Sequence, residues 1–354
     1  MRIWIPLALT GAMIVHHAVL WALTAARRGF SLLEVMNRWD SAHYTAIVEQ
    51  GYSGVLYAFL PLYPALVAAA RRLVGDAVAV PWIGAALSTA FLLSFVAWCA
   101  TREEPAPPEH SPLTPRTGWG WFALLYSPAS YALHSHHTEA VFLLLSFGAL
   151  ASAWDGRAWR AAVFCALCVW TRNQGVFVAG AAALLLIERA PSGARRIARS
   201  VPIIVLAASA YAALMLWESH QAGDPFAHLR AQRHWVPVTT VGEAFRGLWW
   251  GRHGPGATHV LHNLFAAALV LASVLVWRRS RALALYGLIS IAVMLPQGDL
   301  GNSFRFGAVL FPALFAAGDW LAYRPWWVRV AVASAVAWLN HRVTHAFAIG
   351  NWAY

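Results

Sequence analysis

"IWIPLALTGAMIVHHAVLWALTAA", residues 3–26, is an apolar run broken by few polar side chains. A helix needs about 20 such residues to cross the hydrocarbon core of a bilayer. A cleavable signal peptide has a shorter apolar core of about 7–15 residues. We therefore predict that this run is an uncleaved first transmembrane helix.

Similar runs recur along the chain, at 80–100, 118–134, 138–154, 158–171, 173–188, 200–218, 258–277, 281–297, 304–322 and 326–348. Apolar residues make up 60% of the chain and charged residues only 12%, whereas soluble domains carry about 25% charged residues. The mean hydropathy is +0.54. The sequence predicts an all-α polytopic membrane protein, a single domain of residues 1–354 with about ten to eleven transmembrane helices. Two of these runs, 158–171 and 173–188, are short enough to pair as half-spanning helices.

The net charge of +11 comes from arginine, because the chain has no lysine. The arginines gather between apolar runs, at 189–199 and 278–281, as they do in loops on the inner side of a membrane. This pattern favours topology marking over nucleic-acid binding. Several tryptophans, including those at 119–121 and 325–327, are typical of the interfacial belt.

The segment 56–74 decides which polar loops share a face. Pro61 and Pro64 interrupt a regular helix there, so we expect a re-entrant or surface-lying piece. The polar stretches 31–55, 134–139, 171–175, 219–257 and 296–306 then lie together on the outer face of the plasma membrane. Counting 56–74 as a span and 158–188 as one long helix gives the opposite orientation for the first half, and the distribution of arginines favours the first scheme.

The most polar of these stretches is "NRWDSAHYTAIVEQGY", residues 37–52. On a helix, Asp40, His43 and Tyr44 lie on neighbouring positions of one face. A carboxylate at the rim of a bilayer can act as a general base. In the alternative interpretation Asp40 caps an interfacial helix that Gly51 ends, and Arg38 contacts lipid headgroups.

Four segments together resemble the PIG-V family of GPI mannosyltransferases and their prokaryotic relatives. They are "RWDSAHYTAIVEQGY…AFLPLYPAL", "SPASYALHSHHTEAVFLLL", "TRNQG" and "NSFRFGAVLFPAL". The sequence departs from the family pattern where His137 replaces a tyrosine before Thr-Glu, where Gln174 separates Asn from Gly, and where "FLPLYP" lacks a Phe-Pro doublet.

The resemblance implies a GT-C-like bundle that uses a polyprenyl-phosphate-linked sugar, typically mannose, with the acid supplied by the loop after the first helix. Here that loop is 27–79, and its acid is Asp40, the expected general base. With one base and no covalent intermediate, transfer inverts the anomeric centre. The departing phosphate needs cations, for which Arg172 and Arg305 are the candidates, assisted by His43 or His137.

Other polar residues complete the expected substrate site. Glu139 either holds the acceptor sugar, bonds Arg172, or is simply an interfacial carboxylate at the start of a helix. The loop 219–257 is either a lid over the acceptor or a solvated connector. The full set of expected substrate-binding residues is Arg38, His43, Tyr44, His137, Glu139, Arg172, Asn173, Asn302 and Arg305.

The histidines of "HSHHTE" also raise the question of a metal. His134, His136 and His137 do not lie on one helical face, although a loop could bring them together with Asp40 or His43. We assign no metal, and no cofactor is firmly implied.

The rival function is a polytopic transporter or lipid flippase. Such proteins commonly show repeated halves and midplane charges, and this chain shows neither clearly. A third hypothesis keeps the enzyme but changes the sugar on the polyprenyl phosphate. The expected partners are the donor, the lipid bilayer and a glycan, glycolipid or protein acceptor, with no nucleic acid.

Overall fold

A computed structural model describes residues 3–103, 111–190, 195–235, 240–250, 257–295 and 300–351, and these ranges contain helices and no strands. The chain divides into two compact units. Unit 1 comprises residues 1–45, 67–144 and 304–354, and unit 2 comprises 46–66 and 145–303. Both units therefore draw on segments far apart in the sequence. This division does not test the prediction of a single domain.

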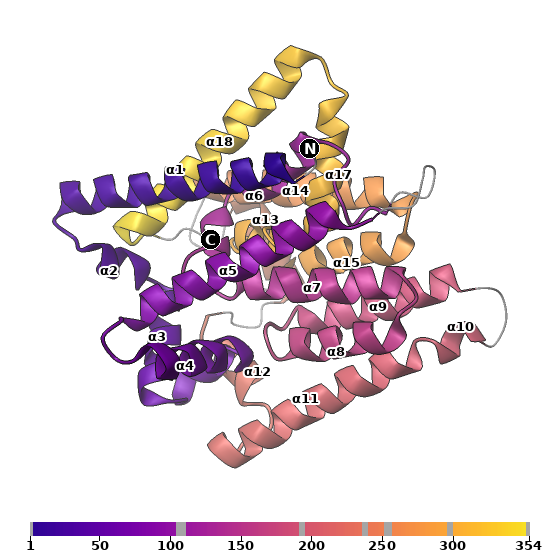
Figure 1. The fold of residues 1–354 in the computed structure, drawn as a ribbon, viewed down its shortest axis with the longest axis horizontal. Coiled ribbons are helices and arrows are strands. Elements are labelled where there is room, and N and C mark those ends of the chain that lie inside the picture. The colour runs from indigo at the N-terminus through magenta and orange to yellow at the C-terminus, as the bar shows by residue number, and fades with distance from the viewer. Residues whose placement is uncertain are drawn as a thin grey trace. The chain divides into compact units, whose positions relative to one another are not determined.

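Unit 1 contains the longest helices of the N- and C-terminal segments (Figure 1). They are α1 (Trp4–Arg28), α2 (Leu32–Met36), α5 (Val80–Thr101), α6 (Gly118–Leu125), the 3₁₀ turn η2 (Ser130–Leu133), α17 (Phe311–Ala322) and α18 (Trp326–Ile349). Helix α1 packs against α5, α6 and α18, and α17 packs against α6. Helices α3 (Asp40–Gln50), α4 (Leu62–Val74), α7 (Glu139–Trp154) and α16 (Ser303–Gly307) begin in one unit and end in the other.

Unit 2 holds the middle of the chain. Its helices are η1 (Gly54–Ala58), α8 (Ala158–Val169), α9 (Gly175–Arg189), α10 (Arg195–Ala198), α11 (Val201–Ala222), α12 (Ala227–Gln232), α13 (Val241–Trp250), α14 (Ala257–Trp277) and α15 (Arg281–Ala292). Helices α8, α9 and α11 pack together, and α15 packs against both α9 and α14. The expected pairing of the two short apolar runs, now α8 and α9, is therefore present.

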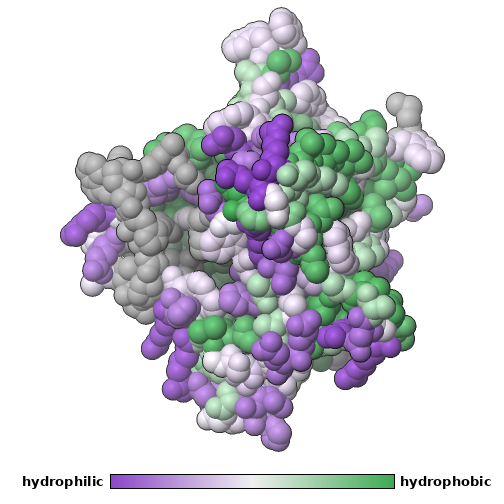
Figure 2. Space-filling view, turned by 90° about the vertical axis from the view of Figure 1, so that its left-hand side faces the viewer, coloured by the Kyte–Doolittle hydropathy of each residue, from purple (hydrophilic) through white to green (hydrophobic). Residues whose placement is uncertain are grey.

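Four helices of the described residues are long and apolar enough to cross a membrane: Trp4–Arg28, Val80–Thr101, Val201–Ala222 and His259–Trp277. Shorter apolar helices occur at Glu139–Trp154, Ala158–Val169 and Arg281–Ala292. Hydrophobic residues form patches beside hydrophilic ones on the face drawn in Figure 2. These features confirm an all-α polytopic membrane protein, and the expected total of about ten to eleven spans stays a prediction.

Two expected helices are interrupted. The run 118–134 forms a helix only as far as Leu125 and continues as the short turn η2, and Pro128 lies in the break. The run 304–322 is divided into α16 and α17, and Pro312 occupies the first turn of α17. Proline lacks the N–H that a continuous helix needs, so both interruptions have a local cause.

The segment 56–74 also contains a break. Residues 54–58 form a 3₁₀ turn, and α4 begins only after Pro61. Helix α4 has 13 residues, a length of about 20 Å at 1.5 Å per residue, which is shorter than the hydrocarbon core. A short helix agrees with the expectation of a piece that does not span the membrane.

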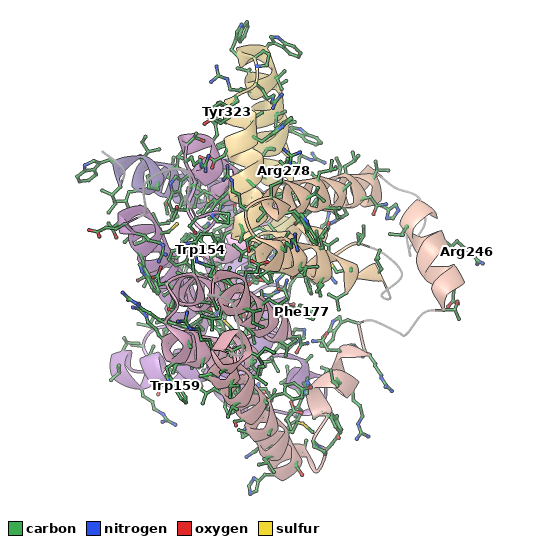
Figure 3. The ribbon with its side chains drawn as sticks, turned by 90° about the vertical axis from the view of Figure 1, so that its right-hand side faces the viewer. Trp154, Trp159, Phe177, Arg246, Arg278 and Tyr323 are labelled. Atoms are coloured by element: carbon green, nitrogen blue, oxygen red, sulfur yellow. The ribbon has the colours of Figure 1, made fainter. Side chains whose placement is uncertain are left out.

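Aromatic residues at helix ends are partly exposed, as expected for an interfacial belt. Trp326 and Trp327 are 70% and 61% exposed. The labelled Tyr323 and Trp159 also lie at helix ends (Figure 3) and are 73% and 69% exposed. Trp121 differs from the expectation: it packs edge-on against Phe95 and Phe315 in the core.

Candidate active site

The segment that leads into α3 has an unusual backbone. Trp39 has a φ of +54°, which costs a side-chain-bearing residue about 1–2 kcal/mol. The turn is closed by the backbone N–H of Ser41, which donates to the carbonyl of Arg38 at 3.1 Å. Backbone strain of this kind persists only where the surroundings hold it, and it gathers at functional sites. The strained residue directly precedes Asp40, the first residue of α3.

Arg38 anchors the same turn. Its guanidinium lies 4.4 Å from the centre of the Phe30 ring. A Cβ added to Gly350, the residue that ends α18 with a φ of +78°, would lie 2.3 Å from Nη1 of Arg38. The positive φ favours a glycine at position 350. Arg38 is half-buried, beside Phe30 and Gly350.

Arg305 lies between two carboxylates from distant parts of unit 1. Its Nη1 donates to Oδ2 of Asp40, and its Nε donates to Oε1 of Glu139. The three side chains come from the start of α3, the start of α7 and α16. An arginine offers its donors in a planar fork, so one guanidinium fixes the orientation of both acids.

The two carboxylates differ in their access to solvent. The Asp40 side chain is 21% exposed, the Arg305 side chain 10%, and the Glu139 side chain 0%. A buried carboxylate is costly unless a counter-charge compensates it, and Arg305 provides that charge. The trio carries one net negative charge, with Asp40 as its accessible member.

Tyr44 extends the site along α3. It lies one helical turn after Asp40, and its hydroxyl donates to Oγ1 of Thr138 at 3.4 Å. Burial raises the pKa of the Tyr44 hydroxyl well above its usual range. Tyr44 is therefore a neutral hydrogen-bonding group, in contact with the ring of His136 at a centroid distance of 5.7 Å. His43, the intervening candidate, is half-buried.

Serine hydroxyls hold the polar loop 134–138 against α3 and α5. Ser41 donates to the carbonyl of His136 at 3.0 Å, and Ser88 donates to the carbonyl of His137 at 2.9 Å. The ring of His137 bonds the hydroxyl of Ser135 at 2.8 Å and is fully buried. The structure therefore places His137 in the support of the loop that ends at Glu139.

A second polar network, not anticipated from the sequence, supports this loop from α1 and α18. Nδ1 of His17 bonds Nε2 of His134 at 2.8 Å, and Nε2 of His17 bonds Oδ1 of Asn340 at 2.9 Å. The Asn340 amide donates to the carbonyl of Ser127 and to the hydroxyl of Ser130, both at 2.9 Å. The sequence contains a sign of this network, the histidine pair His16 and His17 inside the first apolar run. Such residues are rare and costly in a membrane span unless they are hydrogen-bonded.

Unit 1 thus brings together Asp40, Tyr44, Glu139 and Arg305, with Arg38 and His137 in supporting positions. The other candidates lie in unit 2: Arg172 is half-buried, Asn173 is exposed and Asn302 is half-buried. Their part in substrate binding stays a prediction. Glu139 accepts a bond from Arg305, and its expected bond to Arg172 stays a prediction.

The loop 219–257 is only partly covered by the described residues, which exclude 236–239 and 251–256. Its best-defined feature is His228, whose Nδ1 bonds Oε2 of Glu218 at 2.8 Å and whose Nε2 bonds the hydroxyl of Tyr211 at 3.1 Å. In the described ranges no three His, Cys, Asp or Glu side chains form a group suited to a metal. The expectation of a metal-free site is not tested by this observation.

Comparison with known proteins gives one match. No curated protein and no solved structure matches the chain. The model of the family described as Mannosyltransferase (PIG-V) matches residues 25–204, which is more than half of the 354 residues. The matched range contains Asp40 and Glu139, and Arg305 lies beyond it. The chain therefore belongs to the PIG-V mannosyltransferase family and is an integral-membrane glycosyltransferase.

Proposed function

We propose that this enzyme transfers mannose from a polyprenyl-phosphate-linked donor to an acceptor hydroxyl at the extracytoplasmic face, with inversion at the anomeric carbon. Asp40 is the general base of this proposal. A single observation carries it: of the two carboxylates that share Arg305, only Asp40 is accessible, at 21% exposure against 0% for Glu139.

The accessible carboxylate is suited to proton removal. As the acceptor oxygen attacks the anomeric carbon, its proton passes to Asp40, and the bond from that carbon to the phosphate oxygen breaks. The polyprenyl phosphate leaves with the electron pair. A positioned general base contributes about 10²–10⁴ to such a rate.

The burial of Glu139 supports inversion. A retaining mechanism needs a second carboxylate that reaches the sugar from the opposite face and forms a covalent bond with it. Glu139 has no exposed side-chain area and bonds Arg305, so it is poorly placed to be that nucleophile. Direct displacement requires only the one accessible acid.

Arg305 serves as a positioning residue in this scheme. Its fork is occupied by Asp40 and Glu139, and these two negative charges oppose the approach of a phosphate to the same guanidinium. The cation that stabilises the departing phosphate is then better sought in Arg172 or His43, the other predicted partners. Arg305 acts by holding Asp40 in one orientation.

The direct test uses purified protein with radiolabelled polyprenyl-phosphate mannose and native membranes. The expected result is a labelled product whose mannose linkage is inverted relative to the donor, as read by NMR or by linkage-specific mannosidases. The same donor carrying glucose or arabinose tests the choice of sugar. A product with a retained linkage would contradict the mechanism, and transfer from a sugar nucleotide alone would contradict the donor class.

A further inference from the structure

A cavity separate from the Asp40 trio lies between α1 and α18 in unit 1. It has a volume of about 440 Å³ and is partly open. From α1 it is lined by Leu20, Leu23, Arg27 and Arg28, the last two of which belong to the final helical turn. The α1 wall therefore changes from apolar to cationic toward the end of the helix.

The α18 wall is also polar and basic. His341, Arg342 and His345 line the cavity from this helix. Nε2 of His16 on α1 bonds Nδ1 of His341 at 3.2 Å, which ties the two helices together beside the cavity. His345 lies within electrostatic range of Arg28 and Arg342. Cationic groups from both helices thus converge on one space.

No acid balances these arginines in the part of the chain that the structure describes. The ion pairs of Arg71, Arg230 and Arg305 lie elsewhere among the described residues. The ends of α1 and α18 each add a partial negative charge of about half an elementary charge. The three positive charges of Arg27, Arg28 and Arg342 are larger than the sum of these partial negative charges. The cavity therefore carries a net positive charge even when its histidines are neutral.

The cavity opens next to an apolar stripe. Val15, Val19 and Leu23 recur every four residues on α1 and are 61%, 51% and 52% exposed, and Leu23 also lines the cavity. Trp338, one turn before Arg342 on α18, is 55% exposed. Figure 2 shows the face on which α1 ends, where hydrophilic residues gather beside hydrophobic ones.

The arginines at the end of α1 lie at the depth of lipid headgroups. Helix α1 has 25 residues, a length of about 37 Å, so Arg27 and Arg28 at its end reach beyond a hydrocarbon core of about 30 Å. Helix α18 runs in the same direction, because His17 meets Asn340 and Trp21 meets Phe347. Arg342 follows His341, which meets His16 at the middle of α1, so it begins deeper than Arg27, and its side chain lines the same cavity.

We propose that this cavity binds the phosphate headgroup of an anionic membrane lipid, with an acyl chain along the Val15–Val19–Leu23 stripe. Arginine matches phosphate through paired, charge-assisted N–H donors, and juxtamembrane basic residues favour anionic lipids by about 1 kcal/mol each. The stripe favours a lipid over a soluble phosphate, because a soluble ligand gains nothing from apolar surface.

The proposal is independent of Asp40 catalysis, and its test measures binding alone. The full-length protein in detergent is titrated with phosphatidylglycerol and with phosphatidylcholine, and the bound lipid is quantified by native mass spectrometry. Arg342→Gln is compared with Arg324→Gln, which removes the same charge from an exposed arginine of unit 1 that stacks on Trp320 at 4.2 Å. Arg342→Lys keeps the positive charge but not the planar guanidinium, so it tests whether charge alone is enough for lipid binding.

We expect phosphatidylglycerol to bind more tightly than phosphatidylcholine, and Arg342→Gln to weaken it about tenfold, the loss of one charge-assisted hydrogen bond. Arg342→Lys retains part of the affinity, and Arg324→Gln leaves it within about twofold. Equal affinities for the two lipids would overturn the proposal, as would equal losses in Arg342→Gln and Arg324→Gln.

Two further measurements distinguish a bulk lipid from a free phosphate and from the polyprenyl phosphate donor. Glycerol phosphate is added as a soluble competitor, and polyprenyl phosphate as a second lipid. Displacement of phosphatidylglycerol by comparable concentrations of glycerol phosphate would assign the cavity to a free phosphate. Tighter binding of polyprenyl phosphate, lost in Arg342→Gln, would assign it to the donor, and either result would refute the assignment to bulk lipid.

Discussion

The carboxylate of Asp40 accepts a hydrogen bond from Arg305, a residue 265 positions further along the chain. The same guanidinium donates to Glu139, whose side chain has no exposed area. One cation therefore fixes the accessible acid and neutralises the buried one. The shared arginine therefore links the two acids of the candidate site.

Replacing Asp40 by Asn removes the proposed base and keeps an oxygen that can accept from Arg305. We expect mannose transfer to fall by about 10²–10⁴, with little change in thermal stability in detergent. The matched control is Asp76→Asn, which breaks an exposed ion pair with Arg71. Transfer within a few-fold of the unsubstituted enzyme would rule out Asp40 as the base.

Arg305 is expected to contribute to stability through Glu139. Arg305→Met removes a counter-charge from the buried carboxylate of Glu139, a change that costs about 3–5 kcal/mol. In the double variant with Glu139→Gln the cost is partly recovered, because no buried charge remains. Denaturant unfolding of the single and double variants measures this coupling free energy. Additive effects of the two substitutions would show that the bond contributes nothing.

Gly84 on α5 is expected to be essential for the position of the loop 134–138. A Cβ at this residue would lie 1.8 Å from Nδ1 of His136, so Gly84→Ala must displace the loop or the helix. The expected result is a lower melting temperature and reduced transfer. Gly11→Ala on α1 is the control, because a Cβ there meets nothing within 4 Å, and alanine raises helix propensity. A Gly84→Ala enzyme with normal stability and transfer would contradict the packing described here.

His136 is expected to make stability depend on pH. Burial lowers the pKa of His136 to about 3 from its ordinary value of 6.5. The unfolded chain then binds a proton between these values that the folded protein does not. The stability contributed by the neutral ring is therefore complete above pH 6.5 and falls as the pH drops, by up to about 1.4 kcal/mol per pH unit.

The measurement is unfolding in detergent at pH 7, 6 and 5, with His136→Gln for comparison. The substitution should flatten the profile in this range, because it removes one titrating group. A profile that is equally steep in both proteins would mean that other groups dominate the acid sensitivity.

Much of the fold was predictable from local sequence, and Asp40 could be named from it as a candidate acid. The apolar runs that became α1, α5, α11 and α14 are recognisable because a bilayer selects for length and hydrophobicity, which are properties of a continuous segment. Asp40 was recognisable because an acid beside a membrane span is unusual, and the family pattern around it is contiguous. The breaks at Leu125 and Leu310 were missed, although Pro128 and Pro312 marked them.

The sequence by itself determined that the chain crosses a membrane, that it is a PIG-V mannosyltransferase, and that Asp40 and Glu139 are its notable acids. Only the tertiary structure showed that both acids share Arg305. It also decided which acid is accessible and joined His17 to His134 and Asn340. The physical reason is that hydropathy and local motifs act within a segment, whereas charge pairing and burial depend on which distant segments pack together.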